Sequence, residues 1–248
     1  MSNLFKLLKV LAAIIPYSII LFHLCFLGVI GTSIFQLHDH NPASTPLMRS
    51  RPFTPVSIPP GFTQLNKLPS DLVRTILFAE DGYFFRHGGF SLRYIQRALD
   101  LNQRMGYSAY GGSTVTQQLA RTLFLNIDKS YLRKYFELLI AIEMEMLISK
   151  NRILELYMNY IELGPGIYGI TDAARVYFNK SPRECTSEEK LMLATIMPAP
   201  IQYSPFTFRS NEILVRRYLY LRHYFQFEQR IPPRFSSEIE ELPLSALD

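Results

Sequence analysis

The chain has 248 residues, a hydrophobic fraction of 48% and a formal net charge of +5 at pH 7. This length is enough for one sizeable domain, or for one domain with an appendage. The mild basic excess is compatible with anionic partners such as phosphates or lipid headgroups, and equally with ordinary solubility. The only cysteines are Cys25 and Cys185, and no Cys/His cluster has zinc-site spacing. We therefore expect no disulfide and no metal site.

The first apolar segment, residues 10–30, contains no Asp, Glu, Lys or Arg. It is long enough to cross a bilayer, which takes about 20 apolar residues. Lys6 and Lys9 precede it, and no Lys or Arg follows until Arg49, so the positive-inside rule predicts a cytoplasmic N-terminus and an exported remainder. A cleaved signal peptide is the alternative, but its apolar core is usually shorter and no small-residue cleavage site follows. We expect a retained transmembrane anchor.

A proline-rich segment, residues 42–60, follows the anchor. Because proline lacks an N–H and fixes φ, we expect neither helix nor central strand there, but an extended spacer. Apolar residues then recur at helical spacing in 70–85, with Ser70 as the expected N-cap. Further helices are expected at 113–125, 131–147, 151–163, 169–178, 186–197 and 211–227. The predicted fold class is all-α, and the chain divides into a cytoplasmic N-terminus (1–9), a transmembrane helix (10–30), a linker (31–64), a helical domain (65–230) and a tail (231–248).

Two carboxylates, Glu80 and Asp81, stand directly behind an apolar run. On a continuous helix Glu80, Phe84 and His87 would share one face, and Asp81 would point elsewhere, toward backbone or a cation. The two glycines after His87 would end this helix. A carboxylate at an apolar edge is a candidate general acid or base. Taken alone, the stretch is explained equally well by a capped amphipathic helix with solvated acids.

A second polar stretch, "GGSTVTQQLAR", spans residues 111–121. Its glycines permit close backbone approach, and the helix that follows would offer free N–H groups and its dipole to a phosphate. Ser113 or Thr114 can cap this helix, and the Gln117 and Gln118 amides and the Arg121 guanidinium would donate hydrogen bonds to sugar hydroxyls or phosphate oxygens. The residues of this stretch that we expect to contact the substrate are Ser113, Thr114, Thr116, Gln117, Gln118 and Arg121. The alternative is a flexible loop followed by a polar helix face.

A third stretch concentrates positive charge beside a carboxylate. Lys129, Arg133 and Lys134 lie just before Glu137, which suggests a diphosphate clamp next to a second carboxylate. Arg133 and Glu137 are four residues apart, so a surface ion pair is the alternative. In a fourth stretch, residues 149–159, the polar side chains are expected to have structural roles, with Ser149 as N-cap.

The order of these stretches resembles the peptidoglycan glycosyltransferase domain, family 51, found in bifunctional penicillin-binding proteins and in monofunctional membrane-anchored enzymes. The family motifs E-D-x-x-F-x-x-H-x-G, G-x-S-T-[IV]-T-Q-Q, R-K-x-x-E and S-K-x-x-I-L-E-x-Y-[LM]-N, and a fifth region, are matched at 80–89, 111–118, 133–137, 149–159 and 164–182. The resemblance covers about residues 65–205. Five positions depart from the family pattern without removing either carboxylate: Ser91, Arg121, Thr122, Asn179 and Lys190.

The resemblance implies a lysozyme-like helical domain that polymerises lipid II, an undecaprenyl-diphosphate-linked disaccharide peptide, through β-1,4 bonds with inversion. It implies Glu80 as general base on the acceptor hydroxyl and Glu137 as a group that orients the donor diphosphate. The cationic side chains named above would offset the diphosphate charge, and Asp81 and His87 would contribute to substrate binding. No cofactor is required, although a divalent cation could assist.

The expected partners are lipid II, the growing glycan strand, the membrane and other cell-wall synthesis proteins, with no nucleic acid. The expected location is the bacterial cytoplasmic (inner) membrane, with the catalytic domain periplasmic or extracellular. No S-x-x-K motif with its companions follows the helical body, so we expect a monofunctional enzyme without a transpeptidase domain. Two alternatives stay open: a non-catalytic membrane-tethered scaffold, which the intact carboxylates disfavour, and a lysozyme-like lytic enzyme, which needs neither an anchor nor a phosphate-binding face.

Overall fold

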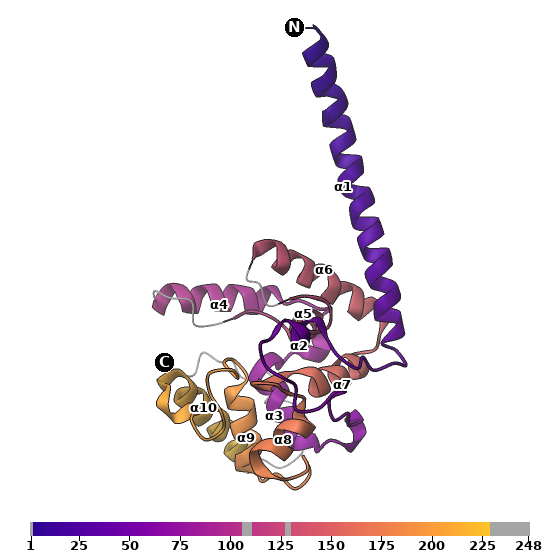
Figure 1. The fold of residues 1–248 in the computed structure, drawn as a ribbon. Helices are drawn as coiled ribbons and strands as arrows, with labels where there is room; N and C mark the ends of the chain where they lie inside the picture. Colours follow the sequence, from indigo (N-terminus) through magenta and orange to yellow (C-terminus); the bar gives the residue numbers. More distant parts are fainter. Residues whose placement is uncertain (1, 106–110, 127–129, 229–248) are drawn as a thin grey trace.

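A computed structural model describes residues 2–105, 111–126 and 130–228. This part of the chain is mostly helical (Figure 1), which confirms the predicted all-α class. The α-helices are α1 (Ser2–Gln36), α2 (Pro46–Ser50), α3 (Ser70–Asp81), α4 (Leu92–Met105), α5 (Val115–Phe124), α6 (Tyr131–Leu147), α7 (Lys150–Tyr160), α8 (Ile170–Phe178), α9 (Ser187–Ile196) and α10 (Glu212–Glu228). Short 3-10 turns lie at Leu65–Lys67, Phe84–Arg86 and Phe208–Ser210, and two strands, β1 (Glu162–Gly164) and β2 (Ile167–Tyr168), form an antiparallel hairpin.

Helix α1 extends far from the body and ends against α6 (Figure 1). Its segment Ile14–Gln36 has a mean hydropathy of 2.1 and is long and apolar enough to cross a membrane. The helix continues past residue 30, and Ile34 is buried in the domain core. Phe26 packs on Phe136 of α6 at a ring-centroid distance of 4.7 Å. The last turns of α1 therefore belong to the folded body as well as to the candidate membrane span.

The proline-rich segment contains the helix α2, so the expectation of no helix between residues 42 and 60 is wrong. Pro46 occupies the first turn, where its missing N–H costs nothing, and the Thr45 side chain accepts a hydrogen bond from the N–H of Met48 at 3.2 Å. Leu47 and Met48 are buried and pack in the core. The Val56 N–H donates to the carbonyl of Gly166 at 2.8 Å. This segment is a strap across the domain rather than a free spacer.

Helix α3 differs from its prediction at both ends. Ser70 is its first helical residue and not its cap; Pro69 stands at the cap position without a side-chain bond. The helix ends at Asp81, before the chain enters a 3-10 turn, so Glu80, Phe84 and His87 do not share one helix face. Gly82 follows the last residue and is a weak helix former, and the pairing of Asp81 with His87, described below, turns the chain back on itself.

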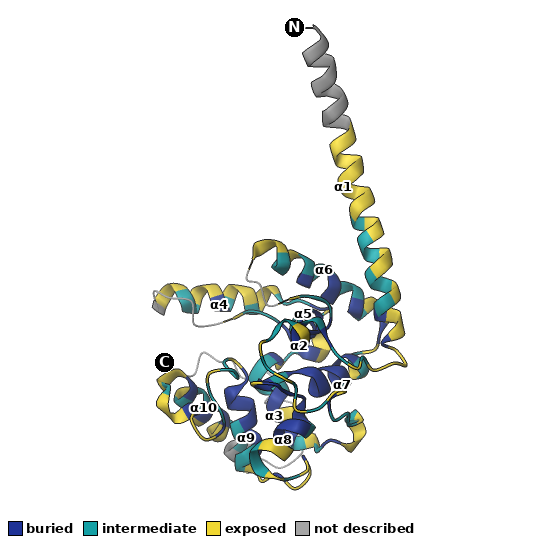
Figure 2. Ribbon diagram, in the orientation of Figure 1, coloured by how far each residue is buried: buried dark blue, intermediate teal, exposed yellow. Residues whose placement is uncertain are grey.

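Helix α4 was not predicted from the sequence. Most of this helix is exposed (Figure 2). Its exposed residues include the apolar side chains of Leu92 and Leu99. Only Ala98 among its described residues is fully buried. Leu92, Ile95 and Leu99 recur at helical spacing, so the pattern of an amphipathic helix is present in the sequence although the prediction omitted it.

The core lies where α5, α6 and α7 pack together (Figure 2). Its central side chains are almost fully buried and apolar; they include Val115, Leu119, Ile140, Met144, Ile153 and Leu156. Burying each such side chain contributes about 1.5–3 kcal/mol relative to exposure. Polar caps define the ends: Ser149 caps α7, as predicted, by accepting a hydrogen bond from the N–H of Arg152. Helix α6 carries Glu137, and α5 carries Gln118, which contacts Glu80 of α3.

Candidate active site

The carboxylate of Glu80 is held by side chains from two other helices. Its Oε2 accepts a hydrogen bond from the Gln118 amide of α5 at 2.9 Å, and its Oε1 accepts one from the Arg217 guanidinium of α10 at 2.5 Å. The Glu80 side chain is 12% exposed. The Tyr157 hydroxyl of α7 donates to the Gln118 carbonyl oxygen at 3.0 Å. Glu80 therefore has a defined direction and a small opening to solvent.

Tyr157 is itself buried and lies near Glu80. Burial raises the pKa of its hydroxyl well above the ordinary tyrosine value, and the nearby Glu80 charge raises it further. The hydroxyl consequently stays neutral at all physiological pH values. As a permanent donor to Gln118, it orients the amide so that the Gln118 NH₂ group points at Glu80.

Arg217 was missed in the sequence reasoning. It is anchored by hydrogen bonds to the carbonyl of Ala194 in α9, at 3.1 and 3.3 Å. Its neighbour Arg216 points away and pairs with Glu212 on the surface. The adjacent arginines are visible in the predicted helix 211–227, but helical spacing alone does not show which one faces a carboxylate more than a hundred residues earlier.

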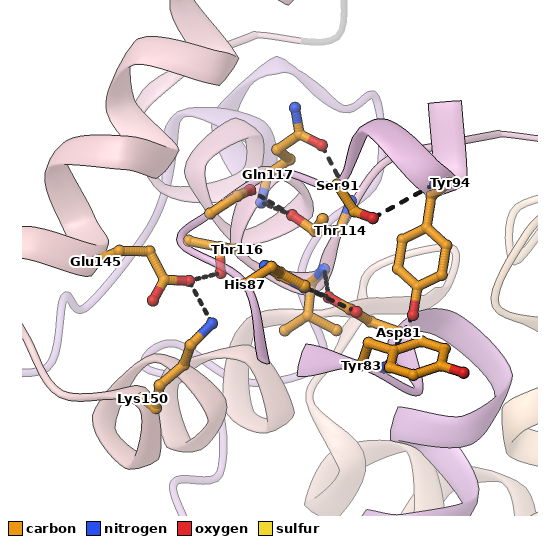
Figure 3. Close-up of polar contacts among 12 residues, drawn as sticks. Asp81, Tyr83, His87, Ser91, Tyr94, Thr114, Thr116, Gln117, Glu145 and Lys150 are labelled. Atoms are coloured by element: carbon orange, nitrogen blue, oxygen red, sulfur yellow. Dashed lines mark hydrogen bonds and ion pairs between the residues drawn. The ribbon is translucent and has the colours of Figure 1, made fainter. Parts of the chain in front are cut away.

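Asp81 binds His87 and the start of α5 (Figure 3). Its oxygens lie 2.9 and 3.0 Å from His87 Nε2, and its Oδ2 accepts the N–H of Val115 at 2.9 Å. The predicted bond of Asp81 to backbone is confirmed, but its expected separation from His87 is wrong. A buried carboxylate at a helix N-terminus is stabilised by the helix dipole. This cluster joins the end of α3 to the start of α5 and thereby positions Glu80 next to Gln118.

The start of α5 is occupied by the protein's own side chains. Thr114 and Gln117 form a reciprocal capping box, in which Thr114 Oγ1 accepts the N–H of Gln117 and Gln117 Oε1 accepts that of Thr114 (Figure 3). With Val115 bound to Asp81, the expectation of free N–H groups for phosphate is wrong at Val115 and Gln117. Thr116 is buried and donates to Glu145 at 2.5 Å. Thr114, Thr116 and Gln117 thus hold the helix in place.

A second carboxylate, Glu137 on α6, is 1% exposed and forms ion pairs with two cationic side chains. Arg133 Nη1 donates to Glu137 Oε2 at 2.6 Å, and Lys134 Nζ donates to Oε1. Lys134 also donates to Ser113 Oγ at 2.7 Å. The cluster is therefore no surface ion pair. Its lysine remains 43% exposed, so positive charge faces solvent at the edge of a buried carboxylate.

Two further cations are predicted from the sequence to bind diphosphate. Arg121, on α5, is partly exposed. Lys129 lies outside the described residues.

Both cysteines are free thiols, Cys25 exposed and Cys185 buried. Within the described residues, no group of three or more His, Cys, Asp or Glu side chains could hold a metal ion.

The departures from the family pattern are accommodated locally. Asn179 adopts a left-handed conformation, φ 54°, at the C-terminus of α8, where asparagine is the usual substitute for glycine. Lys190 is largely buried and pairs with Asp71 at 2.7 Å. Thr122 donates to the backbone carbonyl of Gln118 at 3.0 Å, and Ser91 Oγ lies 3.4 Å from the N–H of Tyr94. None of these contacts displaces Glu80 or Glu137.

Comparison of the sequence with known proteins identifies a family and several relatives. The family model described as Transglycosylase matches residues 60–224. A biosynthetic peptidoglycan transglycosylase of Aromatoleum aromaticum is 39% identical over 180 residues, covering 70% of this chain and 78% of the relative. One of Thiobacillus denitrificans is 38% identical over 159 residues, covering 64% and 68%. Penicillin-binding protein 1A of Aquifex aeolicus is 38% identical over 184 residues, covering 74% of this chain, which spans a quarter (25%) of that protein. With both carboxylates and their partners in place, the chain belongs to the transglycosylase family.

Proposed function

We propose that this protein is a membrane-anchored peptidoglycan glycosyltransferase that polymerises lipid II into β-1,4-linked glycan strands and releases undecaprenyl diphosphate. The observation that carries the proposal is the pair of held carboxylates. Glu80 is directed by Gln118 and Arg217, and Glu137 is buried between Arg133 and Lys134. The relatives named as biosynthetic peptidoglycan transglycosylases support the biosynthetic direction over a lytic one.

Inversion at the donor carbon requires a base on one face and a leaving group on the other. Glu80 takes the proton of the acceptor 4-OH while the oxygen of this hydroxyl forms the new bond to the donor C1. The bond between C1 and the diphosphate oxygen breaks at the same time, and undecaprenyl diphosphate leaves with the electron pair. Gln118 and Arg217 keep the carboxylate in one orientation, which is needed for proton transfer in a fixed geometry.

The leaving diphosphate gains negative charge as the bond breaks. Arg133 and Lys134 can offset this charge, and Glu137 holds the two cations in position before substrate arrives. Such preorganised charge costs no reorganisation during the reaction. This chemistry needs no cofactor, and a divalent cation on the diphosphate is compatible with it.

The surface around α1 supports a membrane location. Tyr131 and Leu132 at the start of α6 are 97% and 65% exposed, and α4 exposes Leu92 and Leu99. These helices lie on the side of the body from which α1 extends (Figure 1). Exposed apolar clusters of this kind mark interaction surfaces. We place the N-terminus in the cytoplasm and the body at the outer face of the cytoplasmic membrane, where lipid II, the growing strand and other cell-wall synthesis proteins would meet it.

The direct test is incubation of the purified full chain with labelled lipid II in detergent or lipid bilayers. We expect a ladder of labelled glycan polymers that a muramidase degrades. Cleavage of finished glycan without polymer formation would favour the lytic alternative. Binding of lipid II without any product would favour the scaffold alternative.

Replacing both Arg121 and Lys129 by glutamine should weaken lipid II binding by about tenfold or more. Charge-assisted contacts to phosphate are short and strong, and glutamine supplies neither charge. Binding is measured with fluorescent lipid II at low salt. The control replaces Lys67 and Arg209, both exposed cations, by glutamine; this pair should bind as the wild type does. Equal binding by both double variants would rule out a diphosphate role for Arg121 and Lys129.

Arg217→Gln should lower kcat by about ten- to a hundredfold with little change in KM, because small misplacements of a catalytic group are costly in rate. Arg217→Lys should recover part of the loss, since an ammonium can still pair with Glu80. The matched control is Arg216→Gln, which changes the adjacent arginine on the outer surface. A loss of similar size in the control, or none in Arg217→Gln, would remove Arg217 from the site.

A further inference from the structure

A groove of about 540 Å³ lies between the last turns of α1 and the C-terminal half of α6. Gly31 brings the two helices close: a Cβ at this position would sit 2.6 Å from the Glu143 carboxylate of α6. Gly28 lies one turn earlier, and a Cβ added there would have no heavy atom within 4 Å. The groove is separate from Glu80 and Glu137, and the proposed reaction uses none of its residues.

The floor of this groove contains an unsatisfied carboxylate. Glu143 Oε2 is buried and has no hydrogen-bond partner among the described residues. Burial raises the pKa of Glu143 above its ordinary value, because the charged form loses solvation. Buried polar groups in folded proteins are nearly always paired, and leaving one unpaired carries a free-energy cost. A cationic ligand in the groove would remove this cost.

The remaining lining suits a lipid headgroup. Gln36, on α1, offers a side-chain amide that can donate to phosphate oxygens, whereas the Thr32 hydroxyl donates to the carbonyl of Val29 at 2.8 Å within the helix. Leu27, Phe35 and Leu147 make the rest of the wall apolar. The groove also lies at the C-terminal end of the candidate membrane span, Ile14–Gln36, which is the depth at which headgroups meet the hydrocarbon core.

We propose that this groove binds an ammonium-bearing phospholipid headgroup, phosphoethanolamine, with its ammonium on Glu143 and its phosphate toward Gln36. The inference rests on the proposed membrane anchoring, and not on the identity of the reaction. A bound headgroup would fasten α1 to α6, the helix that also carries Glu137. The alternative occupant is a transmembrane helix of a second protein or a second copy.

Native mass spectrometry of the full chain in detergent micelles tests the site. The chain is titrated with phosphatidylethanolamine and, separately, with phosphatidylglycerol of the same acyl chains. We expect phosphatidylethanolamine to bind about tenfold more tightly, because only its headgroup supplies a cation for a charge-assisted contact. Glu143→Gln should reduce binding of phosphatidylethanolamine to the level of phosphatidylglycerol. Gly28→Leu, whose Cβ would meet open space in the lining of the groove, should do the same.

The control Glu212→Gln removes an exposed carboxylate on α10, which should leave lipid binding unchanged. Equal affinity for the two lipids, or an undiminished preference in Glu143→Gln, would overturn the proposal. A change of oligomeric mass in Gly28→Leu with no lipid bound to the wild type would overturn it in favour of helix docking. Parallel polymerisation assays separate the two proposals: Glu143→Gln should still polymerise lipid II, whereas a chain that binds phosphatidylethanolamine but makes no polymer would refute only the proposed reaction.

Discussion

Glu80→Gln is expected to reduce glycan polymerisation by about a hundred- to ten-thousandfold, the usual contribution of general base catalysis. Glutamine has almost the same shape and can still accept a hydrogen bond from Arg217 or Gln118, so the surroundings of position 80 are retained. It cannot take the proton from the acceptor hydroxyl. Substrate binding should therefore survive while turnover is lost.

The measurement compares polymer formation from labelled lipid II by wild type and variant, with thermal melting as a folding check. A matched control is Glu162→Gln. Glu162 is 11% exposed and pairs with Arg51 at 2.5 Å, an environment close to that of Glu80, but on the β hairpin. The control should polymerise at the wild-type rate. If Glu80→Gln melts normally and polymerises as fast as the control, another base must be sought.

Asp81→Ala is expected to lower the free energy of unfolding by about 2–5 kcal/mol, because two buried donors lose their acceptor and each such loss costs about 1–3 kcal/mol. The change strands the His87 ring and leaves the N–H of Val115 without its acceptor. For a domain of this size the melting temperature should fall by about 10 °C. The two substitutions should therefore differ in the property that they change: the one at Asp81 should lower stability, and the one at Glu80 should lower turnover.

Urea or thermal unfolding of the purified variants measures this effect. The control is Asp39→Ala. Asp39 also pairs with a histidine, His38, at 2.9 Å, but its side chain is 78% exposed, so its loss should cost at most about 1 kcal/mol. Asp81→Asn, which keeps the shape, should fall between the two. Equal melting of Asp81→Ala and Asp39→Ala would show that the buried pair does not stabilise the fold.

Several helices could be located from the sequence because the pattern and the caps agree. The expected segment 131–147 is α6 itself, and 113–125 contains α5, with Thr114 among the two predicted caps. Apolar residues at helical spacing report the buried face of a helix, and the capping side chain marks its start, so both signals are local. The all-α class and both carboxylates with their motif order likewise required only the sequence.

Elements that depend on distant contacts were predicted poorly. Helix α2 forms because Leu47 and Met48 bury against the core, which outweighs the surrounding prolines. The end of α3 at Asp81 depends on the pairing of this residue with His87 and with the N–H of Val115 on another helix. In each case tertiary contacts override the local preference.

The sequence by itself determined the fold class, the apolar segment long enough to cross a membrane, and the choice of Glu80 and Glu137 as candidate catalytic carboxylates. Only the tertiary structure decided what surrounds them: Arg217 on Glu80, two cations on a buried Glu137, and Asp81 in a structural bond rather than facing the substrate. The physical reason is that a side chain's chemistry is set by its partners and its burial. These partners come from helices that are far apart in the chain and meet only when the core packs.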